Sequence, residues 1–257
     1  METAEFQKQV FTYDDIDDHL SRLPSQAYWS RVAFLTRLKR AGRLIRVRRG
    51  LFCLAPPGER AEELLVDPLL VASKLTCDSV ISHGSALECL GLAPGPAGEA
   101  IYSAGRPLNP IVFRDRHYRG VKFPKSLVRS SRQRMLVKTV ERGGSLISVT
   151  RAERALVDLL DRPDLAGGWA KTVKLLGVLS KLDLSEVVAY TRALANSTTA
   201  AKVGWYLTGR RDHFGDIEGH LIELSALKPN QPHYLDRSRR RDGRLVADWN
   251  LIVNCEE

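Results

Sequence analysis

A stretch near the start of the chain, residues 19–58, carries nine Arg or Lys and no Asp or Glu. The chemistry that it offers is polyanion binding, because cationic side chains neutralise phosphates and release the counterions condensed on nucleic acid. A solvated charged face is the alternative explanation. The absence of acids over the whole stretch favours nucleic acid. The basic residues are Arg22, Arg31, Arg37, Lys39, Arg40, Arg43, Arg46, Arg48 and Arg49.

Two elements are expected to position these cations. A helix is predicted from Ser25 to Ala41, with Ser25 as its N-cap and Gly42 at its end. A tight hairpin follows over residues 43–54, and its turn is Arg48-Arg49-Gly50 because glycine readily adopts a positive φ. A basic helix beside a basic two-stranded ribbon is the surface that a winged helix-turn-helix presents to DNA.

Helical periodicity divides the predicted helix into two faces. The face expected to pack on the domain carries Val32, Phe34, Leu35, Leu38 and Ala41. Arg31 also falls on that side and is excluded from the set that faces the DNA. The opposite face, expected to enter a groove of the duplex, carries Trp29, Ala33, Thr36, Arg37 and Arg40, with Ser30 near its edge.

The helix face and the hairpin together supply the residues expected to bind DNA. Arg37 suits a guanine edge in the major groove, a contact worth about 1–3 kcal/mol of discrimination. Arg48 and Arg49 would contact backbone phosphates or reach the adjacent minor groove, whereas Trp29 is interpreted as a sugar-phosphate contact or a core residue. The full set is Trp29, Ser30, Thr36, Arg37, Arg40, Arg43, Arg46, Arg48 and Arg49.

The overall composition agrees with a polyanionic partner. The 257 residues carry a net charge of +9, the isoelectric point is about 9.6, and 44% of the residues are hydrophobic. The first residues lack the apolar region of a secretory signal, and no apolar run approaches the ~20 residues that span a bilayer. The four cysteines form no C-x-x-C pair, which favours buried, reduced thiols in a cytoplasmic protein without membrane contact.

Motifs for catalysis are weak. Ser82-His83-Gly84-Ser85 is not a G-x-S-x-G sequence, and helix capping by Ser82 explains it better than a nucleophile with its base. Gly84-Ser85 is similar to the opening of polymerase-β-like nucleotidyltransferases, but no Asp-x-Asp follows to hold their metals. The histidines are isolated and no phosphate loop occurs. We therefore expect no enzyme activity, no catalytic residue, no metal and no cofactor.

Three charged groups leave alternatives open. Asp158 and Asp161 share a predicted helix face with Asp164 nearby, and surrounding arginines favour structural ion pairs over a cation site. The basic regions 114–142 and 237–244 are either solvated faces, extensions of a DNA footprint or docking sites for an acidic or RNA-bound partner. The sequence does not decide among these.

The remaining chain is expected to form a larger α+β domain of mixed helices and strands. Pro56-Pro57-Gly58 is typical of a linker and divides residues 1–57 from residues 58–257. Thr150 is expected to cap a helix over residues 151–160, with Glu153 completing a capping box. Other helices are predicted at 67–75, 82–90, 167–180, 184–195, 198–208 and 217–226. Strands are predicted at 100–102, 111–114, 121–128, 136–141 and 146–149, with a closing hairpin of 233–235 and 244–253.

Three segments together resemble one family. They are residues 37–52, residues 80–92, and residues 149–163 with Gly167-Gly168. Their order and spacing resemble the AbiEi family of antitoxins and transcriptional regulators, over roughly residues 12–180 and weakly at 248–253. The winged-helix segment alone occurs in many regulators, so the order of all three carries the resemblance.

The resemblance implies a type IV toxin–antitoxin system. Residues 1–57 would be a winged helix-turn-helix that binds an inverted repeat and represses its own operon. Residues 58–257 would be the antitoxin domain that counteracts a nucleotidyltransferase toxin encoded beside it, directly or functionally. The chain would be a monomer or weak dimer in solution, paired on DNA. The alternatives are a regulator with a ligand-sensing second domain and no toxin partner, or a nuclease guided by the winged helix.

Overall fold

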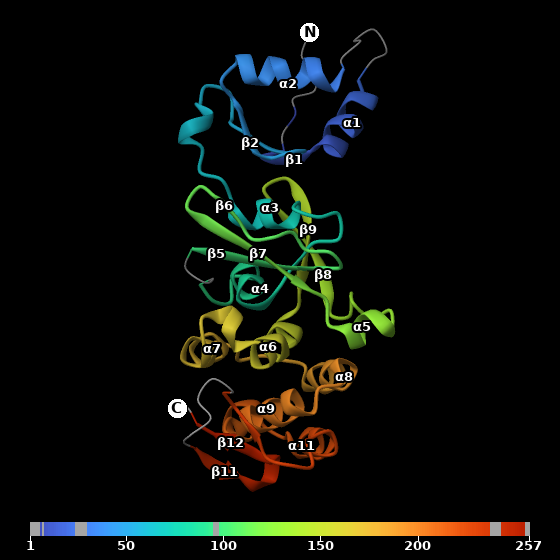
Figure 1. Ribbon diagram of the computed structural model, residues 1–257, viewed down its shortest axis with the longest axis vertical. Helices are drawn as coiled ribbons and strands as arrows, with labels where there is room; N and C mark the ends of the chain where they lie inside the picture. The colour runs from blue at the N-terminus through green and yellow to red at the C-terminus, as the bar shows by residue number, and fades with distance from the viewer. Residues whose placement is uncertain (1–5, 7, 24–29, 95–97, 237–242, 255–257) are drawn as a thin grey trace.

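The structure, a computed structural model, describes residues 6, 8–23, 30–94, 98–236 and 243–254. They form an elongated stack (Figure 1). A small sheet with two helices lies at one end, a six-stranded sheet occupies the middle, and helices lead to a second small sheet at the other end. No helix of the described ranges is long and apolar enough to cross a membrane.

The N-terminal unit contains three strands and two helices. Its strands are antiparallel in the order β1-β3-β2, so β2 and β3 form the predicted hairpin. The elements are β1 (Val10–Thr12), α1 (Tyr13–Ser21), α2 (Arg31–Arg40), β2 (Leu44–Arg48) and β3 (Leu51–Leu54).

The caps of both helices follow from their sequences. Thr12 caps α1 through a reciprocal pair: its hydroxyl accepts the Asp15 N–H at 3.3 Å, and the Asp15 carboxylate accepts the Thr12 N–H at 2.8 Å. In α2 the N-cap is Ser30, not Ser25. Residues 25–29, which include the predicted cap Ser25 and Trp29, lie outside the described residues.

The N-terminal unit has a small core of its own. Its buried members are Phe11, Ile16, Leu38, Phe52 and Leu54, with Phe34 and Leu35 of α2 packed against them. The prediction that Val32 joins this face was wrong, since its side chain is 73% exposed. At about 100° per residue, Val32 lies roughly 115° from the centre of the face made by Phe34, Leu35 and Leu38.

The central sheet is mixed, in the order β6-β7-β5-β4-β9-β8. The pairs β5–β7 and β4–β9 are parallel, and the other neighbours are antiparallel. Helix α3 (Pro68–Ser73) lies on the side of the N-terminal unit, and α4 (His83–Cys89) lies on the opposite side against α6 (Figure 1). The strands are β4 (Val80–Ile81), β5 (Glu99–Ala104), β6 (Ile111–Phe113), β7 (Arg116–Lys122), β8 (Val137–Arg142) and β9 (Ser145–Thr150).

Two local predictions in this region were wrong. The strand predicted at 121–128 ends at Lys122, and helix α5 (Lys125–Arg129) follows because Pro124, which has no N–H for a strand ladder, occupies its N-cap. Thr150 remains in β9, and Arg151 is the N-cap of the next helix. The Glu153 carboxylate accepts the N–H of Asp183 at 3.3 Å instead of closing a capping box.

Helices fill most of the remaining chain, and a small sheet of order β10-β12-β11 closes it. The expected closing hairpin was wrong in its pairing: β10 (His233–Tyr234) is parallel to β12 (Leu251–Val253), which is antiparallel to β11 (Arg244–Val246). The chain reverses between β11 and β12 at Asn250, whose φ is 47°. The helices are α6 (Ala152–Asp161), α7 (Trp169–Leu176), α8 (Leu184–Leu194), α9 (Ser197–Thr208), α10 (Arg211–Phe214) and α11 (Glu218–Ser225).

Direct contacts join the N-terminal unit to the central sheet. Asp15 of α1 is only 9% exposed and forms ion pairs with Lys8 and, at 2.8 Å, with Lys74 after α3. The N–H of Ala61 donates to the Gly42 carbonyl at 3.0 Å. Val10 of β1 also packs in the large core that contains the central sheet. The orientation of the N-terminal unit is therefore set by buried contacts as well as by the chain connection.

The contact of α9 with Trp249 generates a stability prediction. A methyl group added at Gly204 would overlap the Trp249 ring, whose Nε1 donates to the Thr208 hydroxyl at 3.1 Å. Gly204→Ala is expected to lower the free energy of unfolding by about 1–3 kcal/mol through overpacking. Gly219→Ala in α11, where nothing lies within 4 Å of the added methyl, is the matched control in urea denaturation. Equal stability of the two variants would contradict this packing.

The Asp15 cluster generates a pH prediction. Burial raises the pKa of Asp15, but hydrogen bonds from Lys74, Lys8 and Thr12 outweigh it and lower the pKa from 3.8 to about 2. Because the folded pKa is depressed, the stabilisation is present above about pH 4 and is lost as the pH falls towards 2. Asp15→Asn is expected to cost about 2 kcal/mol at pH 7 and progressively less below pH 4.

The measurement is the thermal midpoint of both proteins between pH 7 and pH 3, with Asp18→Asn as the control. Asp18 is exposed and forms no ion pair within the described ranges. A constant difference between wild type and Asp15→Asn across this range would show that the carboxylate charge does not hold the junction.

Candidate nucleic-acid interface

Helix α2 is built to expose a polar and cationic face. The Ser30 hydroxyl accepts the Ala33 N–H at 3.1 Å and so begins the helix, and Gly42 with φ 66° follows its C-terminal end. Arg37, Lys39 and Arg40 lie in the last turn, where cations interact favourably with the helix dipole.

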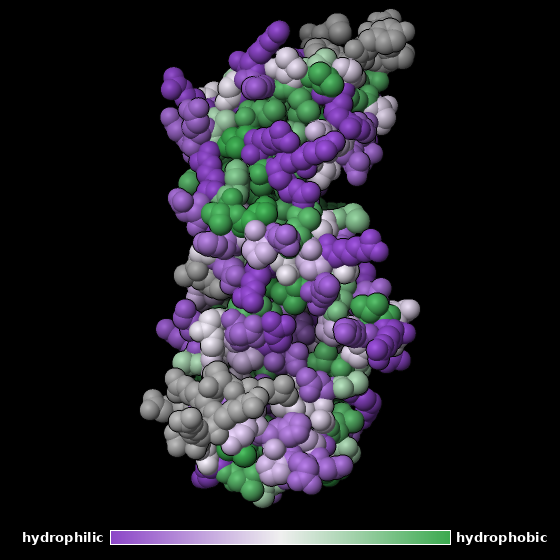
Figure 2. Space-filling model, viewed as in Figure 1, coloured by the Kyte–Doolittle hydropathy of each residue, from purple (hydrophilic) through white to green (hydrophobic). Residues whose placement is uncertain are grey.

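The exposed face of α2 borders a shallow groove. Hydrophilic side chains project from this end of the molecule (Figure 2). Of the predicted DNA-binding residues, Ser30, Thr36, Arg37 and Arg40 line the groove together and are all exposed. Two further residues line the groove: Ala33, which the sequence placed on this face, and Val32, which it placed on the packing face.

The hairpin divides the predicted arginines into two groups. Arg46 and Arg49 are exposed. Arg43 and Arg48 are half-buried: the Arg43 Nε donates to the Ala55 carbonyl at 2.8 Å, and an Arg48 Nη donates to the Leu75 carbonyl at 3.3 Å. A register shift between Arg46 and Arg48 interrupts the regular pairing of β2 with β3 at this end of the strand. The guanidinium of Arg48 therefore lies at the junction below the N-terminal unit.

Two carboxylates of α1 form ion pairs, whereas Asp14 and Asp18 are exposed and form none within the described ranges. Asp17 pairs with Arg31, which also lies 4.6 Å from the centre of the Tyr13 ring, so its exclusion from the groove-facing set agrees with the structure. The hydrogen bond from Arg31 lowers the pKa of Asp17. Asp15 is held by Lys8 and Lys74. Within the described ranges, no carboxylate forms an ion pair with Arg40, Arg43, Arg46, Arg48 or Arg49.

The segment Ser82-His83-Gly84-Ser85 is structural. All four residues are buried, the Ser82 hydroxyl lies 3.0 Å from His83 Nδ1, and Ser103 donates to Ser82 at 2.9 Å. Ser82 occupies the N-cap of α4, but its hydroxyl makes no capping bond. Burial lowers the pKa of His83 and so favours the neutral ring. The Ser82 and His83 side chains are therefore both shielded from solvent.

The predicted aspartate group is also held by internal bonds. Asp158 is buried and accepts from Arg154 at 3.3 Å and from the Tyr190 hydroxyl at 2.6 Å. Burial raises the pKa of Tyr190, so the phenol stays a donor. Asp161 accepts from Asn196 and Thr199 on α9. Among the described residues, no group of three or more His, Cys, Asp or Glu side chains is arranged to hold a metal ion.

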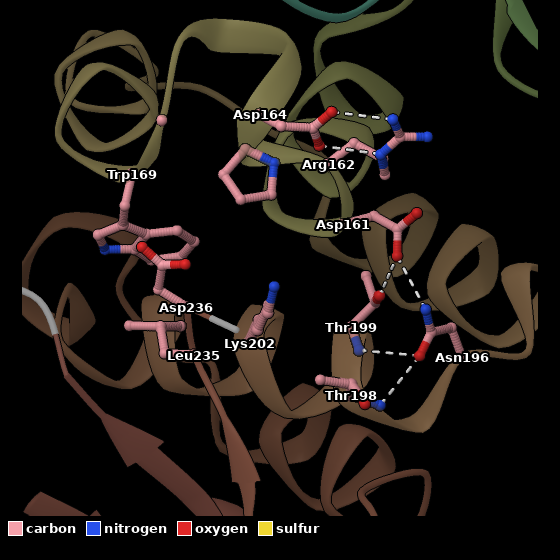
Figure 3. A pocket seen from close by; sticks show the side chains of 12 residues that line it. Asp161, Arg162, Asp164, Trp169, Asn196, Thr198, Thr199, Lys202, Leu235 and Asp236 are labelled. Carbon is pink, nitrogen blue, oxygen red and sulfur yellow. Dashed lines mark hydrogen bonds and ion pairs between the residues drawn. The ribbon is translucent and has the colours of Figure 1, made fainter. Parts of the chain in front are cut away.

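A second candidate site is a cavity of about 470 Å³ between α6, α7 and α9 (Figure 3). Lys202 of α9 points into it, and its ammonium group donates to the Leu160 carbonyl at 3.1 Å and lies 5.7 Å from the centre of the Trp169 ring. Arg162 and Asp164 at the rim pair with each other at 2.9 Å. The walls of the cavity therefore present cationic groups, carboxylates and the Trp169 ring together.

The basic region 114–142 spreads over several elements. Arg114 donates to the carbonyls of Ala61 and Glu62 at 2.7 and 2.6 Å, and Arg142 pairs with Asp67, so both stabilise the fold. The exposed members are Arg114, Lys122, Lys125, Arg129, Arg132, Arg134 and Lys138. In the region 237–244, residues 237–242 lie outside the described part of the chain, and Arg244 is exposed.

Comparison with known proteins gives a family for the N-terminal unit and a fold for the whole chain. The solved structure of the RV2827C protein from Mycobacterium tuberculosis matches with a TM-score of 0.55 and 19% identity, over 95% of this chain and 85% of that one. At this identity the likeness concerns the fold alone. No curated protein matches the chain. Residues 1–55 match the family described as transcriptional regulator, AbiEi antitoxin. The match confirms the resemblance for the N-terminal segment, and residues 80–92 and 149–163, which also carried the resemblance, lie outside the matched range.

Proposed function

We propose that this chain is a DNA-binding antitoxin whose N-terminal unit acts as a winged helix-turn-helix. The observation that carries the proposal is the exposed face of α2, where Thr36, Arg37 and Arg40 line one groove. Two acids of the preceding helix are engaged in ion pairs, Asp15 with lysines and Asp17 with Arg31. A cationic face of this kind is complementary to a phosphate backbone.

In the proposed complex, α2 lies in the major groove and the hairpin lies beside it. Arg37 and Arg40 would contact base edges or flanking phosphates, and the exposed Arg46 and Arg49 would contact phosphates. Arg43 and Arg48 are assigned mainly to the fold, because their guanidinium groups already donate to backbone carbonyls. Two copies on an inverted repeat would double these contacts and repress the chain's own operon.

Residues 58–257 would perform the antitoxin function and counteract a nucleotidyltransferase toxin encoded beside this gene. The family match of residues 1–55 supports this assignment, since that family is one of antitoxins that regulate transcription. The proposal assigns the chain no catalysis of its own, because His83 and Asp158 are buried and internally bonded.

One observation favours a second candidate function. The cavity around Lys202 has a volume within the ~300–1,000 Å³ typical of small-ligand sites, and it presents cationic, anionic and aromatic groups together. A regulator with a ligand-sensing C-terminal region and no toxin partner would use such a cavity. This candidate predicts that no nucleotidyltransferase gene adjoins this one.

Single arginine variants test the DNA interface. Arg37→Ala is expected to lower the preference for the operator over a scrambled duplex by about 1–3 kcal/mol, since it removes a base contact. Arg49→Ala is expected to weaken binding to both duplexes by the same factor, because phosphate contacts carry no sequence information. Fluorescence anisotropy with both duplexes at fixed salt measures the two effects.

The matched control is Lys181→Ala, an exposed lysine between α7 and α8. Its binding to both duplexes should equal that of the wild type. If Arg37→Ala and Arg49→Ala also bind like the wild type, α2 and the hairpin do not form the interface.

A second experiment separates the two proposed duties in the full-length chain. The variant Arg37→Ala with Arg40→Ala is expected to lose repression of a reporter driven by the region upstream of this gene. The same variant should still rescue growth when it is co-expressed with the neighbouring nucleotidyltransferase, because neither arginine lies in residues 58–257. Loss of both activities with an unchanged thermal midpoint would contradict the division of duties.

A further inference from the structure

The N-terminal half of the exposed α2 face is apolar, unlike its C-terminal half. Val32 is 73% exposed, Ala33 is exposed beside it, and the Thr36 side chain with its methyl group follows one turn later. These three residues line the same groove as Arg37 and Arg40. The face therefore changes from apolar to cationic along the helix.

The fold of the described residues does not explain the exposed valine. The core beneath α2 uses Phe34, Leu35 and Leu38 and does not include Val32. An exposed valine next to an alanine contributes nothing to this core, and water around its methyl groups is unfavourable. An apolar partner group that enters the groove would remove that cost.

The major groove of DNA offers one apolar group, the C5 methyl of thymine. In helix-turn-helix complexes the N-terminal residues of the recognition helix contact the base edges. Resting on the function proposed above, we infer that Val32, Ala33 and Thr36 form a thymine-reading patch. The arginines that follow would read guanine edges or bind phosphates.

The helix geometry sets the spacing of the thymines. Val32 and Thr36 are four residues apart, so they are separated by about 6 Å along the helix axis. Base pairs rise by about 3.4 Å along the duplex. Methyl groups contacted by the two side chains would therefore lie within about two base pairs of each other in each half-site.

Replacement of thymine by deoxyuracil tests this inference, because it removes only the methyl group. A high-affinity duplex is first selected from a random pool with the full-length protein, and each thymine is then replaced in turn. Wild-type protein is expected to lose about fourfold in affinity at each contacted thymine. Replacement of thymines outside the half-sites should leave the affinity unchanged and serves as the control.

The variant Val32→Ala tests whether the Val32 side chain contacts one of these thymine methyl groups. Alanine favours the helix and the site is exposed, so the fold should be retained, which circular dichroism checks. At the thymine that faces Val32, deoxyuracil should cost this variant less than twofold, while the other contacted thymine keeps its full effect.

Each outcome separates the inference from the proposed function. If the selection yields no duplex that the protein binds, the DNA-binding proposal itself fails. If a duplex is selected but deoxyuracil has no effect at any position, DNA binding stands and the thymine patch is overturned. Equal sensitivity of the wild type and Val32→Ala to deoxyuracil at every position would also overturn the thymine patch. The same conclusion would follow if Val32→Ala altered the self-association of the protein but not its affinity for any duplex.

Discussion

The proposed DNA interface depends on how the N-terminal unit distributes its charges. Two of the four carboxylates of its first helix are used in ion pairs, whereas Asp14 and Asp18 stay exposed. Asp15 is bound by Lys8 and Lys74, and Asp17 by Arg31. The cations of the exposed face, such as Arg40 and Arg49, are thereby left without an ion pair in the described part of the chain. A surface with uncompensated positive charge is available to a polyanion, and the proposed function follows from this separation of charges.

The same ion pairs attach the unit to its support. Lys74 follows α3 on the central sheet, so its bond with Asp15 joins the two parts of the molecule. Arg48 adds a bond to the Leu75 carbonyl, and Ala61 one to Gly42. The N-terminal unit is consequently packed against the rest of the molecule and is not joined to it by a free linker alone.

The cavity around Lys202 lies between α6, α7 and α9.

Local signals in the sequence predicted much of the N-terminal unit. Thr12 caps α1, the hairpin of β2 and β3 was anticipated, and Arg31 was excluded from the binding face. These features depend on neighbouring residues. Val32 was wrongly assigned to the packing face because it is apolar, although its position around the helix lies far from the centre of that face.

Features that depend on distant segments could not be predicted. The bonds of Arg43 and Arg48 to carbonyls require the tertiary structure, and so does the parallel pairing of β10 with β12. The error at 121–128 is of another kind, since β7 ends at Lys122 and α5 begins after Pro124, a local signal that the prediction overlooked. The cavity around Lys202 joins helices that are far apart in sequence, and no motif signals it.

The most direct test of the central claim is the salt dependence of binding between the full-length protein and a duplex from the region upstream of its own gene. About three to four phosphate contacts per copy, from the arginines assigned to the interface, predict that the logarithm of the association constant falls with the logarithm of salt concentration with a slope of about −3 to −4. A slope close to zero would contradict the claim that the exposed cations of α2 and the hairpin bind the DNA backbone.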